Sequence, residues 1–139
     1  MVLFNKGVVV RKMEISKFLK MSFLIDGLVA VVYGLVMLLI PDMHATAFVF
    51  PYEEFADRYI GALFLGFGVG NLLAYRASSW ENVEFVVYMN IAFLVIGIGV
   101  ILYTIAVAVM PVTAFIQVGL SSFLLILFLY GYYEAKMKK

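Results

Sequence analysis

Apolar positions dominate the chain in long stretches, and the longest, from Phe85 to Tyr133, contains no charged side chain. Two shorter apolar stretches precede it, at about residues 18–40 and 55–77. A transmembrane helix needs roughly 20 apolar residues to cover about 30 Å of hydrocarbon, so the long stretch accommodates two crossings with a break at Pro111. Backbone groups in lipid must bond within their own segment, which favours helices over the short alternating strands of a barrel. The pattern predicts four spans, at about residues 18–40, 55–77, 82–109 and 112–133.

Composition agrees with this pattern. Hydrophobic residues make up 65% of the chain and charged residues 14%, whereas a soluble domain has roughly 25% charged residues. A length of 139 residues allows one domain. We predict an all-α integral membrane protein with a basic cytoplasmic or interfacial segment over residues 1–17 and a transmembrane domain over residues 18–135. The first apolar stretch exceeds the core of a typical signal peptide, so we interpret it as a retained helix.

The distribution of positive charge predicts the orientation. If the chain crosses four times, every lysine and arginine except Arg58 falls on one side: before the first span, at Arg76, and after the fourth span. Cytoplasmic segments carry an excess of Lys and Arg, so both termini are predicted to be cytoplasmic. Short connections between neighbouring spans favour an antiparallel up-down-up-down four-helix transmembrane bundle.

A stripe of small residues recurs every four positions along the second span. Small side chains let helix backbones approach closely in lipid, where no hydrophobic force drives helices together. We expect this stripe to pack against other helices of the same chain, and homodimerisation is the alternative use. The stripe consists of Ala62, Gly66, Gly70 and Ala74.

One carboxylate, Asp26, lies well inside the first span. A lone carboxylate at that depth costs a few kcal/mol and needs a partner, water or a proton. The predicted topology brings four other polar residues to a similar level: Asn71, Arg76, Asn90 and Tyr130. One interpretation is a polar pocket, open to the cytoplasm, in which Asp26 binds a proton, a cation or a substrate amine. The favoured interpretation is a structural cluster, with Asp26 paired to Arg76 or hydrogen-bonded to the two asparagines.

A second group of ionisable residues lies between the first two spans. Carboxylates in such a group can bind a divalent cation. However, Glu54 and Arg58 are four residues apart and are expected to pair, and acidic residues are common where a helix begins. We therefore predict no metal site among Asp42, His44, Glu53, Glu54 and Asp57.

The residue inventory excludes several cofactors. The chain has no cysteine, which excludes disulfides, iron–sulfur clusters and covalent c-type haem. Its single histidine, His44, excludes bis-histidine haem within one chain. No Ser-His-Asp set, HExxH motif or phosphate loop is present. We expect no cofactor, and an enzymatic role is disfavoured.

The region around the second span resembles small four-span membrane proteins of the DoxX-like and BphX-like kind. A first helix ends at Pro41-Asp42, and Asp57-Arg58 then begins a Gly- and Ala-rich helix that ends near Asn71 and Arg76. The resemblance covers about the first 80 residues. It implies a four-helix membrane bundle that often accompanies other membrane enzymes, and it carries over no catalytic residues.

The chain also resembles small multidrug resistance transporters, with Asp26 as the carboxylate of the first helix and Gly97-Ile98-Gly99 in the third. It departs from them in three respects. The acid is Asp and not Glu, the first outer loop is longer, and the strong charge bias argues against the dual-orientation dimer of many such transporters.

Together these features favour a non-catalytic accessory or scaffold subunit in the cell membrane. The alternative is a small proton- or cation-coupled transporter that uses Asp26. We expect the lipid bilayer as the main partner, with a homo-oligomer or a larger membrane complex beyond it, and no nucleic acid. An enzyme acting on lipid or quinone ranks third, because the chain offers no recognisable catalytic set.

Overall fold

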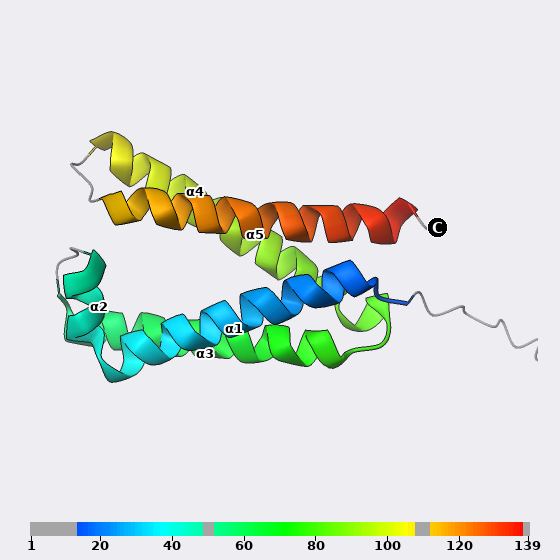
Figure 1. The fold of residues 1–139 in the computed structure, drawn as a ribbon, viewed down its shortest axis with the longest axis horizontal. Coiled ribbons are helices and arrows are strands. Elements are labelled where there is room, and N and C mark those ends of the chain that lie inside the picture. The colour runs from blue at the N-terminus through cyan, green and yellow to red at the C-terminus, as the bar shows by residue number, and fades with distance from the viewer. Residues whose placement is uncertain (1–13, 49–51, 108–111, 138–139) are drawn as a thin grey trace, which may run out of the picture.

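The computed structural model describes residues 14–48, 52–107 and 112–137, and within these ranges every regular element is a helix. The described residues form four long helices, one short helix and one 3-10 turn, arranged as in Figure 1. The elements are α1 (Lys17–Leu39), α2 (Pro41–Phe48), α3 (Glu54–Arg76), a 3-10 turn η1 (Trp80–Asn82), α4 (Glu84–Val107) and α5 (Val112–Met137).

Three of the predicted spans are confirmed as helices that are long and apolar enough to cross a membrane: α1, α4 and α5. The predicted second span corresponds to α3, which has the same length as α1, at 23 residues. Its apolar character is weaker because it carries Glu54, Asp57, Arg58 and Arg76. The sequence between α1 and α3, interpreted as a loop, contains the short helix α2, with Pro41 in its first turn as proline's fixed backbone angle favours.

The long helices run in alternating directions and form two antiparallel pairs, α1 with α3 and α4 with α5 (Figure 1). Both ends of the described chain lie at the same end of the molecule, and α2 lies at the opposite end. We call these the terminal end and the α2 end.

Glycines set the closeness of the first pair. A Cβ atom placed on Gly34 of α1 would lie 2.7 Å from the carbonyl oxygen of Gly61 on α3. A Cβ atom on Gly68 would lie 2.8 Å from the backbone nitrogen of Val31. Only glycine fits at such distances, so the backbones of α1 and α3 are in direct contact. The contact glycines are seven residues apart on each helix, at Gly27 and Gly34 of α1 and at Gly61 and Gly68 of α3, as in left-handed helix packing.

This seam lies on a different face of α3 from the predicted stripe. Ala62 and Gly66 are exposed, and only Ala74 of the stripe is buried. A Cβ atom on Gly66 or Gly70 would meet nothing within 4 Å. The predicted use of the stripe within the chain is therefore corrected, because α1 and α3 pack with a seven-residue spacing that turns these positions outwards.

An apolar core joins the two pairs at the terminal end. Phe23 of α1 meets Phe128 of α5 edge to face, with ring centroids 5.5 Å apart. Leu19 of α1 and Val87 of α4 are buried in the same cluster. Buried side chains therefore fill the space between the pairs near the two described ends of the chain.

We predict that Gly34→Ala destabilises the protein, whereas Gly66→Ala does not. The added methyl group at residue 34 meets backbone atoms that cannot move aside, and such overpacking costs about 1–3 kcal/mol. At residue 66 the same methyl group meets open space. Reversible unfolding in mixed micelles measures the difference. Equal losses of stability in the two variants would contradict the observed seam.

Candidate functional site

Three polar side chains from three helices form a buried hydrogen-bond network. Asn71 of α3 donates to Asp26 of α1 at 2.6 Å and to Asn90 of α4 at 3.1 Å. Asn90 donates back to the Asn71 oxygen at 2.7 Å and to the Val86 carbonyl oxygen at 2.8 Å. Each asparagine therefore uses both amide hydrogens, and all three residues are buried. This network meets the usual requirement that buried polar groups be hydrogen-bonded.

The other two residues predicted for this cluster lie elsewhere. Arg76 is exposed at the end of α3, about 7 Å farther along the helix axis than Asn71 and on another face. Tyr130 is exposed, and its ring packs edge to face on Phe18 with centroids 4.6 Å apart. Of the described residues, only Asn71 donates a hydrogen bond to Asp26.

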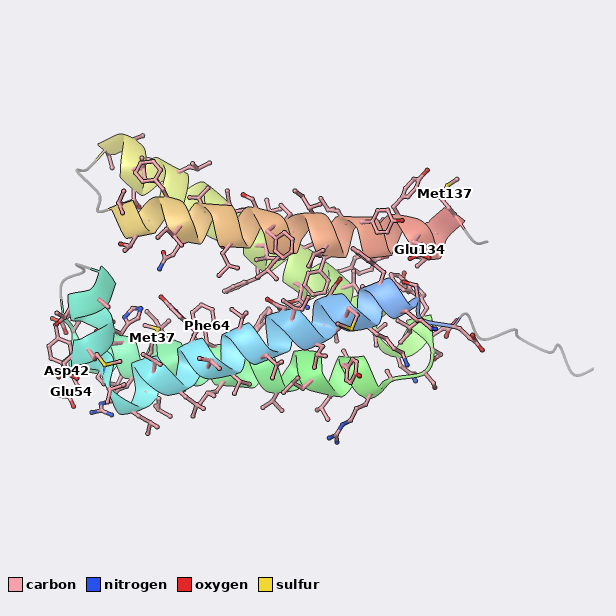
Figure 2. The ribbon with its side chains drawn as sticks, viewed as in Figure 1. Met37, Asp42, Glu54, Phe64, Glu134 and Met137 are labelled. Atoms are coloured by element: carbon pink, nitrogen blue, oxygen red, sulfur yellow. The ribbon has the colours of Figure 1, made fainter. Side chains whose placement is uncertain are left out.

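A cavity of about 590 Å³ lies between the two helix pairs. Met37 and Phe64, labelled in Figure 2, form part of its wall. Rings from α3 and α4 meet there, with the Phe64 and Phe93 centroids 5.9 Å apart. Most of the lining is apolar, and six side chains contribute polar atoms: Asp26, Tyr33, His44, Asp57, Gln117 and Ser121.

The cavity extends from Asp26 towards the α2 end. It is lined there by His44 of α2 and Asp57 of α3. Asp26 is hydrogen-bonded to Asn71 at the inner end of the cavity, and the apolar core around Phe23 lies beyond them towards the terminal end. The less favoured interpretation of the sequence places a pocket on the cytoplasmic side of Asp26, which is the terminal end. The structure corrects this direction, because large apolar side chains fill the terminal end.

Near the α2 end, a second polar group links three helices. The Tyr33 hydroxyl lies 2.6 Å from Nε2 of His44, and the Gln117 amide of α5 donates to the same hydroxyl at 3.2 Å. Because Gln117 donates to the Tyr33 oxygen, the hydroxyl proton is available to His44, which fits a neutral histidine protonated on Nδ1. Sequence reasoning missed Tyr33. Its signal was the seven-residue spacing from Asp26, which places both side chains on one face of α1.

Two opposing effects act on His44. Burial lowers the pKa of His44, and the nearby carboxylate of Asp57 raises it, with burial the larger effect. The pKa of His44 therefore lies below its ordinary value of 6.5. The imidazole is accordingly neutral at pH 7 and able to accept a hydrogen bond from the Tyr33 hydroxyl.

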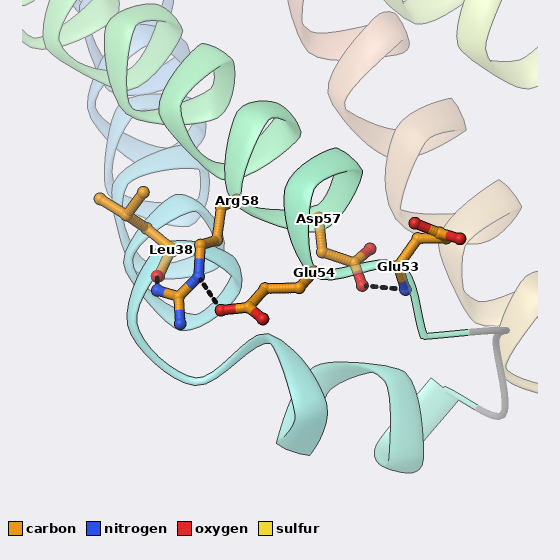
Figure 3. Close-up of polar contacts among 5 residues, drawn as sticks. All are labelled: Leu38, Glu53, Glu54, Asp57 and Arg58. Atoms are coloured by element: carbon orange, nitrogen blue, oxygen red, sulfur yellow. Dashed lines mark hydrogen bonds and ion pairs between the residues drawn. The ribbon is translucent and has the colours of Figure 1, made fainter.

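The acidic residues at the start of α3 are engaged with the protein itself (Figure 3). Arg58 pairs with Glu54 at 3.1 Å, as predicted, and also donates to the Leu38 carbonyl oxygen. The Asp57 carboxylate accepts from the backbone N–H of Glu53 at 3.3 Å. Within the described ranges, no three His, Asp or Glu side chains are grouped to hold a metal ion.

No protein-family model, curated protein or solved structure matches this chain. The chemistry of the cavity therefore rests on its own residues. A mostly apolar wall with a few polar groups is typical of a small-molecule site. The carboxylate of Asp26 supplies a hydrogen-bond acceptor and a potential negative charge at its inner end.

We predict that the NMR titration of His44 gives a pKa below 6.5, and that Asp57→Asn lowers it further. The variant removes the negative charge that favours the imidazolium form. Because the folded pKa is depressed, this group contributes stability above pH 6.5 that is lost as the pH falls through the folded pKa. The single histidine makes the signal unambiguous. An increase in the pKa on Asp57→Asn would contradict the assigned environment.

Proposed function

We propose that the chain is a small four-span membrane protein that binds a ligand between its helix pairs and acts as a proton- or cation-coupled carrier. Asp26 is its ionisable group. One observation carries the proposal: a cavity of about 590 Å³ has Asp26 in its wall at the end next to the filled core. A carboxylate with a purely structural role does not require an open cavity beside it.

The surroundings of Asp26 support a role in binding positive charge. Asp26 is 8% exposed, and its carboxylate receives one hydrogen bond from a neutral amide. The described lining of the cavity contains no lysine or arginine. A carboxylate in such a place needs a proton or a cation for compensation. Binding of one and release of the other is the chemistry of a coupled carrier.

Four crossings with both termini cytoplasmic complete the proposal. α3 is antiparallel to α1 and in backbone contact with it, so the two helices share one depth in the bilayer. The charges of α3 gather at its ends, at Glu54, Asp57, Arg58 and Arg76. Among the described lysines and arginines, all but Arg58 lie towards the terminal end: Lys17, Lys20, Arg76 and Lys136. This distribution suits a cytoplasmic terminal end in the cell membrane.

We predict that Asp42→Cys is labelled by a membrane-impermeant maleimide on intact cells, whereas Ser78→Cys is labelled only after permeabilisation. These positions flank α3 and are both exposed, and the chain has no other cysteine. A crossing by α3 places them on opposite sides of the membrane. Labelling of both from the same side would exclude that crossing and with it the four-span arrangement.

We predict that an organic cation drives proton counterflow through the reconstituted protein. Proteoliposomes that enclose a pH-sensitive dye are exposed to a gradient of benzyltrimethylammonium. The wild-type protein is expected to give a pH change that Asp26→Asn abolishes, because the amide carries neither charge nor titratable proton. Asp42→Asn is the matched control, since Asp42 is an exposed acid that is not among the cavity residues. A wild-type signal that persists in Asp26→Asn would exclude the proposed role.

An accessory or scaffold subunit is the second candidate. It is favoured by the exposed small residues Ala62 and Gly66 on α3, which leave room for a helix of another chain or of a second copy. If this candidate is right, the protein shows no transport, and Asp26→Asn changes only its stability. The flux experiment therefore separates the two functions.

A further inference from the structure

The cavity has a carboxylate at each end. Asp26 lies at the level of Asn71, to which it is hydrogen-bonded. Asp57 precedes Asn71 on α3 by about four turns, which is about 21 Å along the axis at 1.5 Å per residue. Both acids line the same cavity. The cavity is therefore long, and negative charge is available at its two ends.

The wall between these acids is mostly apolar. Its apolar lining includes Ile60 and Phe64 of α3 and Val100 of α4. Two of the polar groups between the acids, Tyr33 and Gln117, are hydrogen-bonded to one another. A ligand that matches this lining is positive at both ends and apolar between them.

We infer that the cavity binds a linear dication, with two ammonium groups joined by an apolar chain, one at Asp26 and the other at Asp57. This inference rests on the proposed function, since it names the class of ligand that the cavity takes. Anions are excluded by like charge, and a ligand with one ammonium group leaves the charge of the second carboxylate without a cation to balance it.

The two acids contribute differently to recognition. Asp26 is buried and provides the stronger electrostatic contact, because solvent screens it little. Asp57 is half-buried and also accepts the Glu53 backbone N–H, so its contact with an ammonium group is weaker. Asp57 makes binding depend on the length of the ligand, because only a ligand that spans the cavity brings its second ammonium group to this carboxylate. The apolar chain gains affinity by leaving water.

Calorimetric titration of the full chain in nanodiscs tests the inference, with empty nanodiscs as the blank. The probes are 1,12-diaminododecane, 1,8-diaminooctane and dodecylamine. The twelve-carbon diamine is expected to bind about tenfold more tightly than either of the others, the gain of one added ion contact. Asp57→Asn removes this advantage, and Asp42→Asn retains it. Asp26→Asn weakens all three probes and remains folded, because its amide oxygen can still accept from Asn71.

Two further results have distinct meanings. If dodecylamine binds as tightly as the diamines and Asp57→Asn changes nothing, the dication is excluded while binding at Asp26 stands. If no probe binds, or if Asp26→Asn binds all three as the wild type does, the proposed function fails along with the inference. A thermal melt of each variant confirms that the protein under test is folded.

Discussion

The hydrogen bonds among Asp26, Asn71 and Asn90 are the constraint on which the rest of the structure depends. They join α1, α3 and α4 at one level and fix the register of three helices. A buried polar network of this kind tolerates no slippage, because a shift of one residue leaves several amide and carboxylate groups unpaired. The network also marks a boundary, with a filled apolar core on its terminal side and a cavity on its α2 side.

The two helix pairs contribute unequally to this arrangement. Backbone contact at Gly34 and Gly61 makes α1 and α3 a close unit. On α4, Gly97 lines the cavity, and a Cβ atom placed on it would meet nothing within 4 Å. The two helix pairs are therefore separated beyond the apolar core, and the cavity lies between them. Near the α2 end, Tyr33 and Gln117 connect the pairs by a hydrogen bond.

The sequence predicted the elements better than their contacts. Length and hydropathy located all four long helices, and the depth of Asp26 relative to Asn71 and Asn90 predicted that they would meet. The face of α3 that packs against α1 differs from the predicted one. Small residues occur on α3 at both four-residue and seven-residue spacing, and the sequence of α3 alone does not show which set contacts α1. The direction of the cavity was also missed, since it depends on the side chains around Phe23 and Phe128, which fill one end. The sequence places His44 in the outer loop, and its contact with Tyr33 depends on the short helix α2, which the sequence did not reveal.

The position of the cavity makes Asp26 accessible from the α2 end, whereas the interior one helical turn towards the terminal end is closed to solvent. Because the chain has no cysteine, single replacements test this directly with a water-soluble thiosulfonate reagent. Ser22, one turn before Asp26 on α1, is 1% exposed and serves as the matched site. We predict that Asp26→Cys reacts in the folded protein and that Ser22→Cys does not. Equal reactivity at the two positions, or protection of both, would contradict it.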